Sequence, residues 1–228
     1  MKKLLSVIAI AMFSCVAFAQ NAQDLAKQQQ ELNEINMKIL NAKPTKDAKA
    51  EAKRLKKDGW VVPAGEKSIE KQLTESQLLG EELMTDEDGG ITKRFIQHTA
   101  SQVSGTYNTG YAAARTAATT ELAALLRTQV AAAMQQKADN QQTSAINAVT
   151  VDKFHERAMA IVDATLTNSR PVVAIYRVLS NNNYEVQVRL AFDKKELSAR
   201  LKRAMQKELE QEGEELNEIV DDVLRGSF

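Results

Sequence analysis

The chain has 228 residues, of which 43% are hydrophobic and 26% are charged, a composition typical of globular proteins with one or two domains. Lys plus Arg and Asp plus Glu both number 30, so the overall charge does not favour a nucleic-acid partner. The charge is nevertheless uneven. Seven basic residues lie between Lys43 and Lys57, whereas eight acidic residues and no basic residue lie between Glu208 and Asp222. This distribution has two interpretations. The charges belong to two solvated helix faces, or they form two surfaces that attract each other or a partner.

The first nineteen residues are typical of a cleavable export signal. Lys2 and Lys3 precede an apolar run that is too short for a permanent membrane anchor, and Ala17-Phe18-Ala19 supplies a small-x-small cleavage site. We therefore expect a signal peptide over residues 1–19, cleaved after Ala19. The product is expected to be exported, either to the periplasm or into the medium.

Cys15 is the only cysteine, and it raises a second hypothesis, a lipidated N-terminus, because the small residue Ser14 precedes it. Met12 and Phe13 fit a lipidation signal badly, so cleavage after Ala19 is the favoured prediction. The processed chain then has no thiol, which excludes disulfides and thiol catalysis.

Residues 20–84 are predicted to form a helical N-terminal arm. Its first helix has a narrow apolar seam, and Pro44 ends it. Thr45 is expected to cap a second helix that runs to Lys57, and Asp58-Gly59 to end that helix.

The second half of this arm contains the only tryptophan. Trp60-Val61-Val62 predicts a short extended segment, in which Trp60 is expected to fill a gap between elements and not to serve as an exposed ligand platform. Ser68 is then expected to cap a third helix that continues to Met84.

The acidic segment Thr85–Gly90 suggests a calcium loop, but its spacing does not fit one. Counting from Asp86, the glycine Gly90 stands where a third ligand is needed, and Gln97 stands where the bidentate glutamate is needed. We interpret the segment as an acidic turn that separates the arm from an α+β domain over residues 91–228.

A long alanine-rich helix from Tyr111 to Met134 is the central element predicted for this domain. Its apolar residues fall on one stripe of a 3.6-residue wheel: Tyr111, Ala114, Ala118, Leu122, Leu125, Leu126, Val130 and Ala133. A strand is expected before it, over Ile91–Val103, and a loop between Gly105 and Gly110.

A helix over about 150–166 and a C-terminal hairpin complete the predicted domain. Val172–Leu179 and Tyr184–Phe192 are β-rich runs separated by an asparagine-rich turn, and the second alternates strictly between apolar and polar residues. Asp193 with Glu196 is expected to cap a following helix. The predicted fold class is α+β: a small antiparallel sheet of about three strands packed by the long helix, with the helical arm in addition.

These segments resemble a known family. The run AAARTAATTELA at 112–123 and the hairpin strand YEVQVRLAFD at 184–193 are similar to the twenty-kilodalton envelope lipoprotein family of Gram-negative bacteria, and to the N-terminal domain of a flagellar-ring assembly protein. The resemblance covers about residues 91 to 195. Upstream, KDGWVVP at 57–63 and IEKQL at 69–73 resemble uncharacterised secreted proteins of anaerobic bacteria.

The resemblance implies a long helix on a small antiparallel sheet, a location in the envelope or outside the cell, and no catalytic residue. Peripheral association with the outer membrane is one mode of binding that it implies. This chain departs from the lipoprotein pattern because its lipidation signal is poor.

Few residues of the chain suggest catalysis. His98 and His155 fall on different predicted elements, and the usual hydrolase and metalloprotease motifs are absent from the sequence. Pairs such as Glu214-Glu215 and Asp221-Asp222 are adjacent, so their carboxylates do not face one substrate from a helix. We predict no catalytic, cofactor-binding or metal-binding residue.

Three functional hypotheses stay open at this point. The favoured one is a non-enzymatic exported envelope protein that binds or assembles with other envelope components through the helical arm, with a protein partner or self-association and no nucleic acid. The second is a released factor that binds a surface or host partner. The third is an enzyme with an unrecognised carboxylate site.

Overall fold

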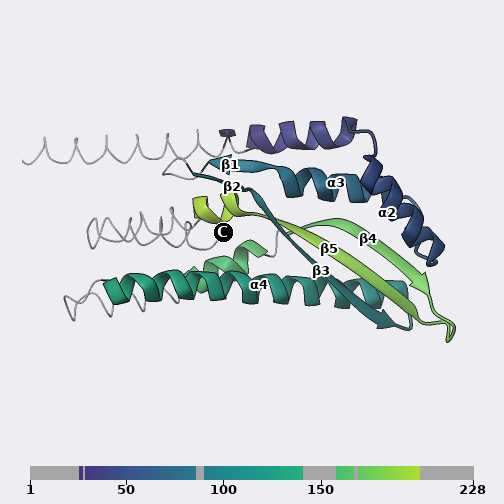
Figure 1. Ribbon diagram of the computed structural model, residues 1–228. Helices are drawn as coiled ribbons and strands as arrows, with labels where there is room; N and C mark the ends of the chain where they lie inside the picture. Colours follow the sequence, from purple (N-terminus) through teal and green to yellow (C-terminus); the bar gives the residue numbers. More distant parts are fainter. Residues whose placement is uncertain (1–25, 28, 86–89, 141–157, 167–168, 201–228) are drawn as a thin grey trace, which may run out of the picture. The chain divides into compact units, whose positions relative to one another are not determined.

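The computed structural model describes residues 26–27, 29–85, 90–140, 158–166 and 169–200 (Figure 1). Contacts divide the chain into two compact units, Met1–Lys43 and Pro44–Phe228. In the first unit, residues 29–41 are helical, as the sequence predicts. The second unit contains the sheets and is described below.

The second unit is an α+β structure, which confirms the predicted fold class. Its main sheet is antiparallel with the strand order β3-β5-β4, where β3 is Phe95–Ser104, β4 is Arg170–Val178 and β5 is Tyr184–Asp193. Helix α4, Tyr107–Asn140, lies along one face of this sheet (Figure 1). Helix α3, Ile69–Glu81, covers the other face.

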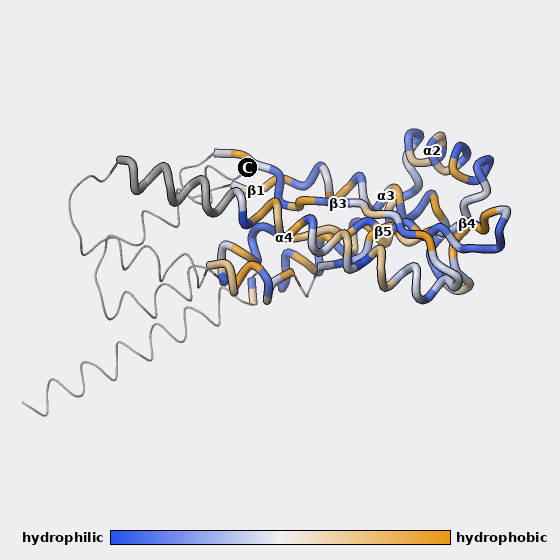
Figure 2. The backbone as a smooth tube through the Cα atoms, turned by 90° about the horizontal axis from the view of Figure 1, so that it is seen from below, coloured by the Kyte–Doolittle hydropathy of each residue, from blue (hydrophilic) through white to orange (hydrophobic). Residues whose placement is uncertain are grey.

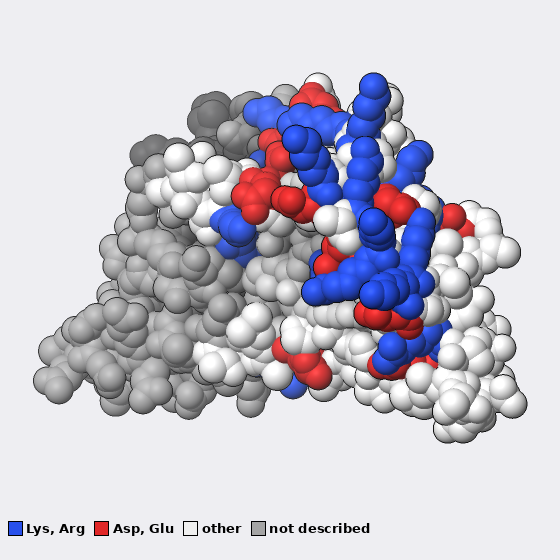
Figure 3. All heavy atoms as spheres, turned by 45° about the vertical axis from the view of Figure 1, so that its right-hand side comes forward, with Lys and Arg blue, Asp and Glu red and all other residues white. Residues whose placement is uncertain are grey.

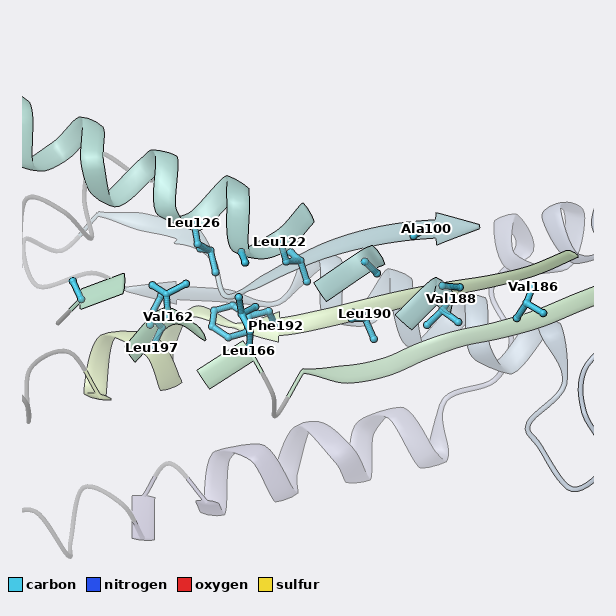
Figure 4. Packing of buried hydrophobic residues seen from close by; sticks show 14 residues of the cluster. Ala100, Leu122, Leu126, Val162, Leu166, Val186, Val188, Leu190, Phe192 and Leu197 are labelled. Atoms are coloured by element: carbon cyan, nitrogen blue, oxygen red, sulfur yellow. The ribbon is translucent and has the colours of Figure 1, made fainter. Parts of the chain in front are cut away.

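The hydrophobic core lies between α4 and the sheet. Along β5, every second side chain points toward α4, and these side chains are at most 2% exposed: Val186, Val188, Leu190 and Phe192. They meet the buried stripe of α4 and the helical residues 158–166 (Figure 4). Bands of hydrophobic residues accordingly follow the strands (Figure 2). The predicted alternation of β5 is therefore confirmed.

The stripe of α4 is mostly as predicted, with one error. Ala114, Ala118, Leu122 and Leu126 are buried, but Leu125 is 43% exposed. On a helical wheel Leu125 lies at the edge of the stripe, and the three-stranded sheet is too narrow to cover both flanks of the helix. Val130 and Ala133 belong to the part of α4 whose side chains are not described.

Helix α4 also begins earlier than predicted, because the segment expected to be a loop up to Gly110 is helical from Tyr107. A Cβ atom built at Gly110 would lie 2.6 Å from Cγ2 of Val186. Glycine is therefore required there by the close approach of α4 to β5, and not by loop flexibility.

The C-terminal hairpin is confirmed. β4 and β5 are antiparallel neighbours, and the turn between them places Asn182 at a φ of 64°, which asparagine tolerates better than most residues. Asp193 caps the helical residues 194–200 by accepting a bond from the N–H of Lys195. Glu196, expected to complete this cap, instead accepts from Arg200.

The other face of the sheet is covered by residues of the predicted helical arm. Helix α2, Lys46–Lys57, packs on α3, and Thr45 caps it as predicted by accepting from the N–H of Ala48 at 3.0 Å. Gln72 of α3 accepts a bond from the N–H of Ala174 in β4 at 2.7 Å. The compact unit that contains the sheet therefore begins at Pro44, ahead of the boundary expected near residue 90.

The predicted end of the third helix is also wrong. α3 ends at Glu81, and β1, Leu83–Thr85, pairs in antiparallel fashion with β2, Ile91–Lys93. The acidic turn thus connects two paired strands, and its residues 86–89 lie outside the described ranges. The strand expected over Ile91–Val103 is interrupted at Arg94, whose side chain is buried and binds Asp193.

Candidate binding surface

Helix α2 has two chemically different sides. Ala48 and Ala52, four residues apart, are fully buried, and their small side chains let α2 approach α3 closely. The rest of the helix is rich in lysine, so hydrophilic and hydrophobic positions alternate along it (Figure 2). Its apolar side is therefore occupied within the fold, and its charged side faces solvent.

Four exposed lysines form a stripe along α2, which we call the lysine stripe: Lys46, Lys49, Lys53 and Lys57. Their spacings of three, four and four residues keep them on one side of the helix over about 16 Å. None of the four ammonium groups forms a hydrogen bond or ion pair with another residue in the described ranges. Lys and Arg side chains gather on this side of the molecule (Figure 3).

The other cations of α2 have carboxylate partners. Arg54 pairs with Glu51 at 2.7 Å, and Lys56 donates to Glu70 of α3 at 2.5 Å. The bond from Lys56 lowers the pKa of the Glu70 carboxyl below its usual value. Within each pair the two opposite charges cancel. The net positive field of α2 therefore comes from the lysine stripe.

The segment after α2 fixes the helix to the sheet edge. Gly59 has a φ of 86°, which ends the helix, and Trp60 is only 7% exposed. The guanidinium of Arg177 in β4 lies 5.0 Å from the Trp60 ring centroid and is held by Glu185 at 2.6 Å. Trp60 therefore joins two elements, as predicted, and α2 has a rigid support.

A polar layer lies between α3 and the sheet, and it contains a serine hydroxyl, Ser76, that could in principle act as a nucleophile. Ser76 Oγ donates to Gln97 at 2.6 Å and accepts from Arg189 at 2.9 Å. Arg189 also donates to Thr99, and burial lowers its pKa. A serine nucleophile needs a base to take its proton, and these neighbours of Ser76 are an amide and a guanidinium. The layer holds α3 in register with β3 and β5.

Two carboxylates with little exposed side-chain surface, Glu75 and Asp193, serve as anchors. Glu75 in α3 accepts bonds from Lys67 and from Arg170 at the start of β4. Asp193 forms a bidentate pair with Arg94, with both side chains at most 9% exposed. Each carboxylate is thus compensated by basic groups, which is the requirement for burying a charge without loss of the fold.

Lys194 has the most strongly altered pKa among the described residues. It is 3% exposed, and burial lowers its pKa from 10.5 to about 8. Its ammonium donates to the hydroxyl of Thr92 in β2 at 2.9 Å. This bond ties the small β1–β2 sheet to the end of β5.

The histidines predicted to be structural are only partly described. His98 lies on β3 and contacts Glu121 of α4, whereas His155 lies outside the described residues. The pairs Glu214-Glu215 and Asp221-Asp222 also lie outside them. Within the described ranges, no group of three or more His, Cys, Asp and Glu side chains is placed to hold a metal ion.

Comparison of the chain with protein-family models, curated proteins and solved structures finds no match. None of the helices in the described part of the chain combines the length and hydrophobicity needed to cross a membrane. The sequence shows an excess of basic residues over 43–57, and the structure adds that four of these lysines lie on one exposed side of α2. The signal that identifies the lysine stripe is the lysine spacing of three, four and four residues.

Proposed function

We propose that this protein is an exported, non-enzymatic binding protein that attaches to anionic components of the cell envelope through the lysine stripe of α2. The observation that carries the proposal is the set of four lysines on one side of a helix whose apolar side is already buried. Such a helix has no hydrophobic face with which to insert into a bilayer, so its attachment is electrostatic and peripheral.

The chemistry of lysine supports an extended anionic partner. An ammonium is a strongly hydrated point charge that does not impose a fixed bidentate geometry, which suits a field of phosphates or carboxylates. Each lysine near an anionic surface contributes about 1 kcal/mol at moderate ionic strength. Four on one stripe therefore give useful but reversible attachment that salt weakens.

Export itself rests on the N-terminal sequence, and the envelope location rests on the resemblance to the envelope lipoprotein family. The second hypothesis, a released factor, shares the fold and differs in location. Fractionating cells into periplasm, outer membrane, vesicles and medium separates the two, because envelope attachment predicts recovery with the membrane fractions and release into solution by high salt.

The sharpest test compares two variants that lose the same charge from the same helix. Lys49→Gln with Lys53→Gln removes half of the lysine stripe, and Arg54→Gln with Lys56→Gln removes the two cations that have carboxylate partners. We expect the first pair to reduce the membrane-bound fraction at least several-fold and the second pair to reduce it clearly less, because its charges do not lie on the lysine stripe. Equal losses from both pairs, or no salt dependence, would contradict the proposal.

A further inference from the structure

The two edges of the main sheet differ in how their backbone groups are satisfied. At the β4 edge, Tyr176 exchanges two backbone hydrogen bonds with Val61, at 2.8 and 2.9 Å, and Ala174 donates to Gln72. This edge also contains Pro171 and a register shift after it. All of these are devices that keep an edge strand from pairing with another chain.

The β3 edge has none of these devices among the described residues. β3 pairs with β5 in unbroken register over ten residues, and from Phe95 to Ser104 it contains no Pro, Lys, Arg, Asp or Glu. The end of β3 near Ser104 is its most exposed part: Ser101 and Gln102 are exposed, and Val103 is 54% exposed.

The ladder also shows which β3 groups point away from the sheet. Because Tyr176 directs its N–H and C=O to Val61, β4 bonds to β5 through the alternate residues Ile175 and Arg177. Those bonds use Gln187 and Glu185 of β5. The alternate residues of β5 bond to β3 instead: Val186, Val188 and Leu190.

The β3 partners of these residues are consequently the ones whose backbone faces β5: Gln102, Ala100 and His98. The alternate residues of β3 direct their N–H and C=O groups outward, away from β5: Thr99, Ser101 and Val103. In the described part of the chain, no backbone hydrogen bond to these outward groups occurs. They form a template for one further strand.

A hydrophobic side chain borders this open edge. Glu121 of α4 contacts His98 of β3, so this side of α4 overlies the edge strand. Leu125 is one helical turn farther along the same side and is 43% exposed. Ala117 and Ala124 lie on the same side and are small enough to allow another helix to approach.

We propose that the β3 edge is a self-association surface, at which two copies of this chain pair in antiparallel fashion about a two-fold axis at Ser101. The pairing joins two three-stranded sheets into one of six strands. A two-fold axis perpendicular to the sheet keeps both α4 helices on the same face of the joined sheet, with one Leu125 toward each end of the seam.

A second copy fits this edge better than an unrelated peptide. No residue between Phe95 and Ser104 carries a fixed charge, so pairing the strand with itself opposes no like charges. A foreign peptide needs pockets for its alternate side chains. The side chains of Ser101 and Val103, which stand beside the outward groups, are small and exposed.

The test uses a proline that removes an outward N–H without breaking the sheet. Ser101→Pro deletes a group that β5 does not use, and Ser101→Ala is the matched control that retains it. We expect sedimentation velocity at micromolar concentration to give a dimer for the unaltered protein and for Ser101→Ala, and a monomer with a nearly unchanged Tm for Ser101→Pro. The dimer should persist in high salt, which separates it from attachment through the lysine stripe.

A second variant covers the case in which the proline damages the fold. Val103→Lys places a charge on each side of the seam and should also give a folded monomer. A monomeric unaltered protein, or a dimer that survives both Ser101→Pro and Val103→Lys, overturns the proposal. Binding of an extended peptide by a monomer would overturn it as well, since the edge would then serve another occupant.

Discussion

At the scale of single residues, the fold is held by polar groups that sequence patterns do not reveal. Arg94 and Asp193 are 99 positions apart and form a bidentate pair, and Gln97 of β3 donates to Ser76 of α3. Each of these residues is an ordinary surface type by composition. Their burial follows from two layers of helix on a narrow sheet, which leaves polar side chains facing one another where α3 meets β3.

Lys194 makes the stability of the fold depend on pH. Its pKa of about 8 in the folded protein is below the usual 10.5, so the fold favours the neutral amine. Below pH 8 the folded and unfolded states are both protonated, and the buried ammonium lowers stability. As pH rises above 8, the folded state releases its proton before the unfolded state does. The free energy of unfolding should therefore rise by about 1–3 kcal/mol toward pH 10.5.

The measurement is urea unfolding at pH 7.5 and pH 9.5, with Lys194→Met as the control. The upper pH stays below the range in which Tyr107 titrates, because burial raises the pKa of that phenol above 10. The gain in stability between the two pH values should be present in the unaltered protein and largely absent in Lys194→Met. An equal gain in both proteins would assign the effect to other groups.

At the scale of elements, Gly110 is the point at which helix α4 packs most closely against Val186 of β5. Alanine is about 1 kcal/mol better than glycine in a helix interior by propensity alone. Here the added Cβ would overlap Val186, which is fully buried. Gly110→Ala should therefore destabilise the protein, by about 1–3 kcal/mol, because overpacking outweighs helix propensity.

A double-mutant cycle tests whether the overlap is the cause. Val186→Ala removes the atoms that the new methyl group would meet, at the cost of a cavity. In that background, Gly110→Ala should be harmless or stabilising in thermal unfolding, giving a coupling energy well above about 0.5 kcal/mol. Additive effects of the two substitutions would show that α4 adjusts and that the close approach does not require glycine.

Sequence patterns predicted most of these elements, and the failures have a common physical origin. The alternation of β5, the caps at Thr45 and Ser68 and the turn at Asn182 are local signals, and all are confirmed. The helix end at Glu81 depends on pairing between β1 and β2, which is a tertiary effect. Leu83 and Met84 continue an apolar helical pattern, so no local signal marked the change to a strand.

The lysine stripe depends on a local sequence pattern, whereas the open β3 edge depends on a tertiary arrangement. The stripe has a helical spacing that can be read from the sequence once α2 is established. The edge depends on strand order, because only the placement of β5 between β3 and β4 leaves the outward groups of β3 unpaired. Strand order comes from long-range contacts, and a single sequence does not specify it.

At the scale of the whole molecule, the position of the domain boundary decides which fragment folds. The sequence predicts a domain over 91–228 preceded by a helical arm, whereas the compact unit that contains the sheet begins at Pro44. Removing residues 44–90 would uncover the α3-facing side of the sheet, where Val173 and Ile175 are at most 3% exposed. It would also leave Ala174 and Arg189 without their partners in α3.

We therefore expect a fragment that starts at Pro44 to unfold in one cooperative thermal transition and a fragment that starts at Ile91 to aggregate or melt without cooperativity. Loss of Trp60 alone, by Trp60→Ala, should cost about 3–5 kcal/mol, a large part of the stability of a typical domain. The longer fragment controls for removal of residues 1–43. If the fragment from Ile91 melts cooperatively near the Tm of the longer one, then α2 and α3 are a detachable layer, and the sheet with α4 is stable by itself.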